Sequence, residues 1–107
     1  MDESKSVRPE LTSKQRRHLR GLAHHLDPVV QVGVKGLTDA VVAQIDGALD
    51  DHELIKVKAA RDCPKTRQDL AAGIEQRASA AVVQIIGRVV VLYRPREEDS
   101  KITLPTG

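Results

Sequence analysis

Aromatic residues are almost absent from this chain of 107 residues: Tyr93 is the one tyrosine, and phenylalanine and tryptophan do not occur. Modules that bind nucleic acids by stacking the bases need several aromatic side chains, and one tyrosine cannot form such a platform. The core must therefore be aliphatic, and the chain is rich in valine, leucine and isoleucine. The length is sufficient for one compact domain and too short for two.

Cysteine and long apolar runs are also scarce. Cys63 is the one cysteine, so a single chain cannot form a disulfide or a metal site based on cysteine. The lack of a disulfide framework is typical of proteins in a reducing cytoplasm. No apolar run approaches the length of about 18 residues that indicates a membrane-spanning helix. The polar start of the chain, MDESKSVRPE, is unlike a signal peptide. We expect a soluble cytoplasmic protein without membrane association.

A formal net charge of only +2 conceals an uneven distribution of charge. Between positions 11 and 36, one acid, Asp27, faces a set of basic residues: Lys14, Arg16, Arg17, Arg20 and Lys35. Between positions 39 and 53, lysine and arginine are absent and the acids are Asp39, Asp46, Asp50, Asp51 and Glu53. The first helix is expected to carry an apolar stripe of Leu19, Leu22, Ala23 and Leu26. On a helical wheel, the side chains opposite the leucines of this stripe are Lys14, Arg17, Arg20, His24 and His25. Such a face is typical of a solvated helix or of contact with a polyanion.

Apolar periodicity and capping signals predict seven elements. Helices are expected over about 13–26, 38–50 and 66–78, and strands over 29–32, 53–59, 80–86 and 89–94. Thr12 with Gln15 forms a capping-box pattern, and Thr38 and Thr66 are the expected N-caps of the later helices. In the second strand, lysines alternate with Ile55 and its apolar neighbours, which indicates one wetter face.

These elements predict the α/β fold class, with a small mixed four-stranded sheet and three helices in the order α-β-α-β-α-β-β. The two βαβ steps require parallel strands with right-handed crossovers. The short connection at Gly87 and Arg88 indicates a hairpin, which adds an antiparallel strand.

Gly33 and Gly36 enclose Val34 and Lys35 where the first strand passes into the second helix. Glycine permits a positive φ or the close approach of another backbone, and a helix start offers N–H groups to a phosphate. Lys35 adds a positive charge, and KH domains use a G-x-x-G loop to hold a nucleic-acid backbone. The same pattern also fits an ordinary turn. It matches neither a Walker loop nor a dinucleotide fingerprint.

Other reactive residues give weaker signals. His18, His24 and His25 do not share one helix face, so solvated histidines fit better than a metal site, and we expect neither metal nor cofactor. The stretch DDHE at 50–53 is typical of a polar turn between a helix and a strand. Cys63 has no neighbouring general base in the sequence, and no nucleophile–base set supports a small hydrolase, so no catalytic residue is predicted.

The stretch LTSKQRRHLRGLAHHLDPVVQVGVKGLTDAVVAQIDGALDDHELIKVK, followed by VVQIIGRVVVLYRPR, resembles the CRM domain (chloroplast RNA splicing and ribosome maturation). The free-standing bacterial members of the YhbY type are the most similar. The resemblance covers residues 11 to about 96, and the end of the chain, SKITLPTG, is also similar. We divide the chain into a flexible arm at 1–10, an RNA-binding domain at 11–96 and a polar tail at 97–107.

The resemblance implies a fold similar to the C-terminal domain of translation initiation factor three. It also implies a non-enzymatic protein that binds RNA and associates with precursors of the large ribosomal subunit; we expect it to be a monomer. The implied RNA-binding residues are Gly33, Val34, Lys35, Gly36 and Thr38 at the loop, and Lys14, Arg16, Arg17 and Arg20 on the first helix. Many members carry lysine directly after the first glycine, whereas Val34 occupies that place here.

The alternative is a small protein-interaction adaptor that uses its acidic second helix to bind a basic partner. The two functions differ in their response to salt. RNA contacts weaken steeply as ionic strength rises, by about 0.7 in the log–log slope for each phosphate of a single strand.

Overall fold

The computed structural model describes residues 9–96 and 99–106. The helices are α1 (Ser13–Ala23), α2 (Asp39–His52) and α3 (Arg67–Ala78), and the strands are β1 (Pro28–Val32), β2 (Leu54–Ala59), β3 (Ala81–Ile86) and β4 (Val89–Tyr93). The predicted order and the α/β class with three helices and a four-stranded mixed sheet are confirmed. The predicted arm lies outside the described residues except for its last two positions. No helix in the described part of the chain is long and apolar enough to cross a membrane.

Each helix begins at a threonine cap, as predicted. The Thr12 hydroxyl oxygen accepts the Gln15 N–H at 3.1 Å, and the Gln15 side chain accepts the Thr12 N–H at 3.1 Å, which completes the capping box. Thr38 caps α2 and Thr66 caps α3 by accepting the N–H three residues ahead. Each cap satisfies an N–H group that the helix leaves unpaired and stabilises the protein by about 1 kcal/mol.

Helix α1 ends at Ala23, earlier than the predicted residue 26. His24 keeps helical dihedral angles, but the Leu26 N–H bonds to the Ala23 carbonyl at 2.9 Å, a tight turn that does not continue the helix. The predicted apolar stripe is therefore wrong in part: Leu19 and Ala23 are buried, whereas Leu22 and Leu26 are exposed. The apolar periodicity predicted a helix that is too long, because Leu26 stands at helical spacing from Leu22.

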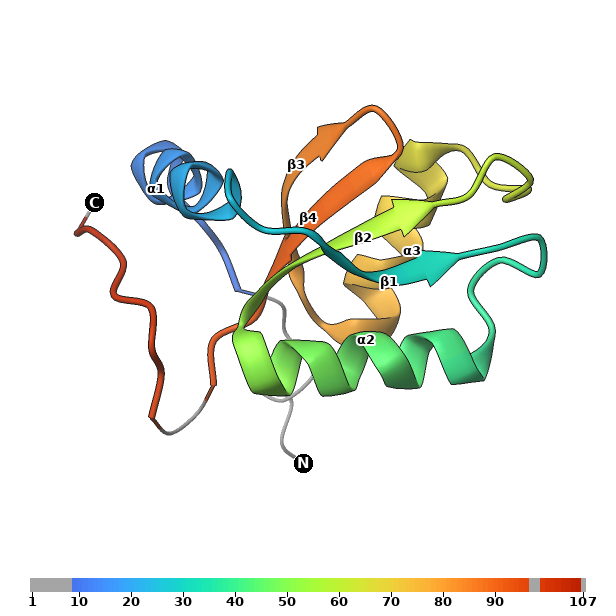
Figure 1. Ribbon diagram of the computed structural model, residues 1–107. Coiled ribbons are helices and arrows are strands. Elements are labelled where there is room, and N and C mark those ends of the chain that lie inside the picture. The colour runs from blue at the N-terminus through green and yellow to red at the C-terminus, as the bar shows by residue number, and fades with distance from the viewer. Residues whose placement is uncertain (1–8, 97–98, 107) are drawn as a thin grey trace.

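The sheet has the strand order β1-β2-β4-β3. Strands β1 and β2 are parallel, and β4 is antiparallel to both β2 and β3. The β3–β4 hairpin therefore places β4 between β2 and β3, and the crossover through α3 passes over one strand. Because β1, β2 and β3 run in the same direction, three connections meet at one end of the sheet, which we call the loop end: residues 33–38, 60–66 and 87–88 (Figure 1).

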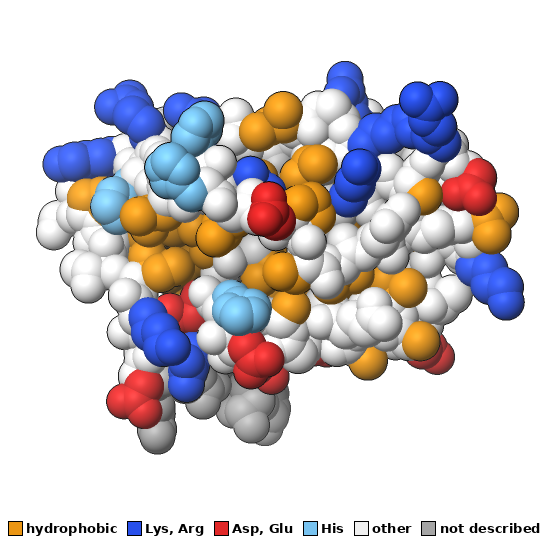
Figure 2. All heavy atoms as spheres, viewed as in Figure 1, with side chains coloured by type: hydrophobic (Ala, Val, Ile, Leu, Met, Phe, Trp, Pro, Cys, Tyr) orange, Lys and Arg blue, Asp and Glu red, His pale blue; other side chains and the backbone are white. Residues whose placement is uncertain are grey.

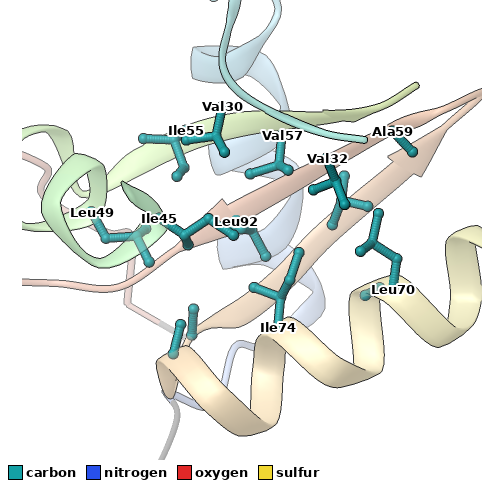
Figure 3. Packing of buried hydrophobic residues seen from close by; sticks show 14 residues of the cluster. Val30, Val32, Ile45, Leu49, Ile55, Val57, Ala59, Leu70, Ile74 and Leu92 are labelled. Atoms are coloured by element: carbon teal, nitrogen blue, oxygen red, sulfur yellow. The ribbon is translucent and has the colours of Figure 1, made fainter. Parts of the chain in front are cut away.

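Two hydrophobic clusters lie on opposite faces of the sheet. On one face, side chains of β1, β2 and β4 point toward α2 and α3, as Figure 3 shows for Val30, Val57 and Leu92 on the sheet and for Ile45, Leu49, Leu70 and Ile74 on the helices. On the other face, α1 packs Leu19 and Ala23 against the sheet, and Tyr93 lies in this cluster. Burying a large aliphatic side chain contributes about 1.5–3 kcal/mol, so helices stabilise the sheet from both sides.

The described part of the tail, residues 99–106, lies against the second cluster. Ile102 and Leu104 pack on it, and Gln15 of α1 donates its side-chain amide to the Pro105 carbonyl at 3.0 Å. The tail therefore reaches α1 at the end of the sheet opposite the loop end (Figure 1).

Candidate nucleic-acid interface

The connection between β1 and α2 is a closed turn. The Gly36 N–H donates to the Gly33 carbonyl at 3.0 Å, so Val34 and Lys35 occupy the two central positions of a β-turn. The Thr38 N–H then donates to the Gly36 carbonyl at 3.0 Å, and α2 begins at the next residue. Val34 is 62% exposed, and Lys35 is exposed as well. The tip of the turn therefore presents one aliphatic and one cationic side chain to solvent.

The two glycines of this turn differ in their backbone conformation and in the space around them. Gly36 has a φ of +71°, a left-handed conformation that other residues adopt at a cost. Gly33 has no such φ, and a Cβ atom added there would meet no atom within 4 Å. The fold therefore favours glycine at Gly36, whereas at Gly33 the missing side chain leaves open space in which another backbone can approach.

The amide groups at the tip of the turn are free for a ligand. The N–H groups of Val34 and Lys35 make no hydrogen bond to another described residue, and successive free amides in a turn form a concave anion-binding surface. The start of α2 is less available, because the Thr38 hydroxyl oxygen accepts the Val41 N–H at 3.1 Å and Asp39 adds a carboxylate. An anion at this loop is therefore best held by the turn amides and the Lys35 ammonium group.

The basic residues of α1 divide into two groups. Lys14, Arg17 and Arg20 are exposed, as the helical wheel predicted. Arg16 is half-buried, and its guanidinium donates through Nη1 to the carbonyl of Val82 on β3. Arg16 therefore fixes α1 to the sheet, and the other three side chains form the free basic face.

The basic face of α1 and the Gly33–Gly36 turn lie at opposite ends of β1. Helix α1 precedes the start of the strand and the turn follows its end, and the five residues of β1 span about 16 Å at about 3.3 Å each. Figure 2 shows lysine and arginine side chains over α1 on one side of the molecule and over the loop end on the other. The two regions are separate basic surfaces, which only an extended ligand could reach together.

Strand β2 carries positive charge between these regions. Lys56 is half-buried and Lys58 is exposed, and both lie on the α1 side of the sheet because Ile55 and Val57 point to the other side. Lys58 pairs in register with Gln31 of β1, which is also exposed. The alternation of lysines with apolar residues gave the signal for this face, but the sequence did not show that it joins the two basic regions.

An open apolar hollow of about 460 Å³ lies beside the end of α1. Leu22, Leu26 and Val29 line it together with Ile102 of the tail, and Val29 is 52% exposed. The hollow explains the exposure of the two leucines that the sequence placed in the core. It gives the α1 side of the molecule an apolar surface next to its positive charge.

The acidic residues of α2 are largely engaged within the protein. Arg94 contacts Asp46 through Nη1 at 2.8 Å and Asp50 through Nη2 at 3.0 Å. Arg77 of α3 contacts Asp39 at 2.7 Å. Helix α2 therefore offers less free negative charge to a basic partner than the sequence suggests.

The residues with weaker signals do not assemble into a reactive group. Among the described residues, no three or more His, Cys, Asp or Glu side chains are placed to hold a metal ion. The rings of His24 and His25 pack edge to face, with centroids 5.1 Å apart. Cys63 is half-buried in the connection between β2 and α3.

Several known proteins are similar to this chain in sequence, and one of them also in its solved structure. The family model described as the CRS1 / YhbY (CRM) domain matches residues 11–94. A Haemophilus influenzae protein named "RNA-binding protein" is 53% identical over 95 residues, which cover 89% of this chain and 95% of the relative. "Probable RNA-binding protein YqeI" of Bacillus subtilis is 42% identical over 89% of this chain and 99% of its own length. The solution structure of a hypothetical protein of Staphylococcus aureus has a TM-score of 0.77 and 38% identity, and the match covers 90% of this chain and 100% of that one.

Proposed function

Because the chain belongs to the CRS1 / YhbY (CRM) domain family, we propose that it binds RNA without catalysing a reaction and acts as an assembly factor on precursors of the large ribosomal subunit. The observation that carries the RNA-binding part is the Gly33–Gly36 turn, with two free amides and Lys35 at its tip. The names of the Haemophilus and Bacillus relatives, which describe RNA-binding proteins, support the same function.

The turn suits a backbone phosphate better than a base. The amides of Val34 and Lys35 supply hydrogen-bond donors, Lys35 supplies a positive charge, and the open space at Gly33 lets the nucleic-acid backbone come close. Thr38 stands next to the turn, and its hydroxyl can still donate a hydrogen bond while its oxygen caps α2. Contacts of this type position an RNA but carry little sequence information.

The basic face of α1 supplies the second contact. Lys14, Arg17 and Arg20 are free to bind phosphates, and Lys58 lies on the sheet surface between them and the turn. The distance of about 16 Å along β1 requires several extended nucleotides. We therefore assign the RNA-binding unit to residues 11–96 and its ligand to single-stranded or locally unfolded RNA.

The ribosomal part of the proposal is supported by the family resemblance and by the chemistry of the surface. A protein without stacking aromatics recognises phosphates and shape, so it needs RNA that is still exposed. Precursor particles expose ribosomal RNA that mature particles fold or cover. The protein then acts as a monomer in the cytoplasm, without a cofactor.

The adaptor alternative has weaker support. It needs a free acidic face on α2, but Asp46 and Asp50 are paired with Arg94, and Asp39 is paired with Arg77. Within the described residues, Asp51 at the end of the helix is the acid of α2 that no ion pair engages.

Sedimentation of cell extract at low and high salt tests the proposal. We expect the protein to sediment with large-subunit precursors at low salt and to dissociate at moderate salt, because reversible phosphate contacts are screened. A Gly33→Asp variant, which places a carboxylate in the open space of the turn, should remain at the top of the gradient. Sedimentation with small subunits only, or at the top at every salt concentration, would contradict the assignment.

A further inference from the structure

A second basic site lies at the loop end, outside the Gly33–Gly36 turn. An open hollow of about 380 Å³ is lined by four cationic side chains: Arg61, Lys65, Arg67 and Arg88. They come from the β2–α3 connection, the first turn of α3 and the β3–β4 turn. Within the part of the chain that the structure describes, no acidic side chain lines this hollow. Four converging cations without a lining carboxylate indicate a site for an anion.

Hydrogen bonds hold the walls of this hollow together. Arg67 donates through Nη1 to the Gly87 carbonyl at 3.0 Å, which links the start of α3 to the β3–β4 turn. The Ala59 N–H donates to the Arg88 carbonyl at 2.7 Å, which links the end of β2 to the same turn. The side chains of Arg61, Lys65 and Arg88 are exposed. A fixed backbone frame thus presents three cations that no ion pair in the described residues neutralises.

The hollow adjoins the proposed phosphate-binding turn. The Ala60 N–H donates to the carbonyl of Val32, the last residue before the turn, at 2.8 Å. An added Cβ atom at Gly36 would lie 3.8 Å from Pro64, in the connection that carries Arg61 and Lys65. The two connections are therefore side by side, as Figure 1 also shows.

We propose that this hollow binds a second RNA backbone phosphate, so that one RNA strand runs from the Gly33–Gly36 turn along the loop end toward the β3–β4 turn. The inference rests on the proposed RNA-binding function. It adds to that function a second phosphate-binding site and the path of the RNA strand across the loop end. Arginine and lysine bind phosphate oxygens through charge-assisted hydrogen bonds. The RNA strand then follows the C-terminal ends of β1, β2 and β3, and it does not have to cross directly to α1.

Single substitutions that each remove one charge test the site. Arg61→Gln, Lys65→Gln and Arg88→Gln remove the positive charge but keep a flexible polar side chain, and none of the three natural side chains makes a hydrogen bond within the described residues. Lys101→Gln is the matched control, because Lys101 is exposed and its backbone N–H bonds to Glu53 at the start of β2, at the end of the sheet opposite the loop end. The control loses the same charge, so it accounts for the long-range effect of net charge on RNA binding.

Titration of a single-stranded RNA at several salt concentrations gives the first readout. Each loop-end variant should bind RNA about threefold to tenfold more weakly at low salt, and its log–log salt slope should fall by about 0.7. Lys101→Gln should retain the affinity and the slope of the natural protein. Thermal unfolding should show the same stability for all four variants, since the substituted side chains are exposed.

The single cysteine gives an independent readout. Cys63 lines the same hollow and is half-buried, so its reaction with iodoacetamide, a neutral reagent, reports directly on occupancy. RNA should slow this reaction in the natural protein and in Lys101→Gln, and should slow it less in the three loop-end variants at equal RNA concentration.

The outcomes separate this inference from the proposed function. If the natural protein binds RNA and Gly33→Asp weakens binding, but the loop-end variants match Lys101→Gln and Cys63 is not protected, the second site is wrong and the function stands. If the natural protein does not bind RNA at low salt, the proposed function fails and this inference fails with it. Weaker binding of the loop-end variants together with protection of Cys63 supports both.

Discussion

The buried carboxylate of Glu53 accepts the backbone N–H of Lys101 at 2.7 Å, across 48 positions of sequence. The same carboxylate accepts the N–H of Arg96 at 2.7 Å and that of Ile102 at 3.2 Å. Glu53 stands between α2 and β2 with a φ of +66°. One side chain thus satisfies three amides of the chain after β4 and holds this segment against the domain.

Glu53→Gln should lower the free energy of unfolding by about 2 kcal/mol, because an amide NH₂ group would face N–H donors and one of them would lose its acceptor in a buried site. Urea unfolding followed by circular dichroism measures the change. Asp51→Asn is the matched control: it removes the same charge from an exposed side chain two positions earlier and should change stability by less than about 0.5 kcal/mol. Equal stability of both variants would show that the carboxylate does not hold the tail.

The contribution of Glu53 to stability should depend on pH. Burial raises the pKa of its carboxyl, but hydrogen bonds from Arg96, Ser100, Lys101 and Ile102 outweigh this effect and hold the pKa below the ordinary value of 4.5. A lowered pKa in the folded state means that the stabilisation is present above the unfolded pKa and is lost as pH falls through the folded pKa. The difference in stability between the natural protein and Glu53→Gln should therefore be full at neutral pH and shrink well below pH 4.5. Urea unfolding across this range checks the prediction, and a difference that does not change with pH would contradict it.

Tyr93 should report on the same carboxylate at alkaline pH. Burial and the negative charge of Glu53 raise the pKa of its phenol above the ordinary value of 10.0. Because Tyr93 is the one tyrosine in the chain, the ultraviolet absorbance of tyrosinate follows this group alone. In Glu53→Gln the pKa of Tyr93 should fall but stay above 10.0, since burial remains. An unchanged titration, with circular dichroism showing both proteins folded, would mean that the charge of Glu53 does not reach the ring.

Local signals predicted the elements well, and contacts distant in sequence explain the errors. Thr12, Thr38 and Thr66 marked the three helix starts because a cap acts within four residues. The stretch DDHE indicates a polar turn at Glu53, whereas the structure buries this residue, since its burial depends on the tail that returns 48 positions later. The place of β4 inside the sheet likewise depends on pairing with β2, which no short pattern of sequence contains.

The candidate interface was predicted in its parts and not in its arrangement. The pattern of two glycines and a lysine identified the turn, and the helical wheel identified three of the four basic side chains as free. The wheel could not show that Arg16 turns toward the Val82 carbonyl, since that acceptor belongs to β3. The second basic site was not predicted. The close spacing of Arg61, Lys65 and Arg67 in the sequence could have indicated it, but Arg88 joins them only through the hairpin.

The two glycines of the turn should respond differently to substitution. Gly36→Ala should destabilise the protein by about 1 kcal/mol because of its positive φ, whereas Gly33→Ala should leave stability nearly unchanged because its Cβ meets open space. Gly33→Ala should nevertheless weaken RNA binding, and Gly33→Asp should weaken it more through charge repulsion. Thermal unfolding and RNA titration of the same samples measure both effects. RNA affinity that is unchanged in a folded Gly33→Asp variant would exclude a phosphate contact at this turn.

Substitution of Arg16 should affect stability, whereas substitution of its neighbour Arg17 should affect RNA binding. Arg16→Ala removes the donor to the Val82 carbonyl and should lower the free energy of unfolding by about 1 kcal/mol, since α1 loses a link to β3. Arg17→Ala removes an exposed side chain, so it should leave stability within about 0.5 kcal/mol of the natural protein. It should weaken RNA binding and reduce the log–log salt slope by about 0.7, because a phosphate contact is lost. Urea unfolding and RNA titration of the two variants separate the roles. If Arg17→Ala binds RNA with the affinity and slope of the natural protein, the free basic face of α1 is not part of the interface, and RNA must be held at the loop end alone.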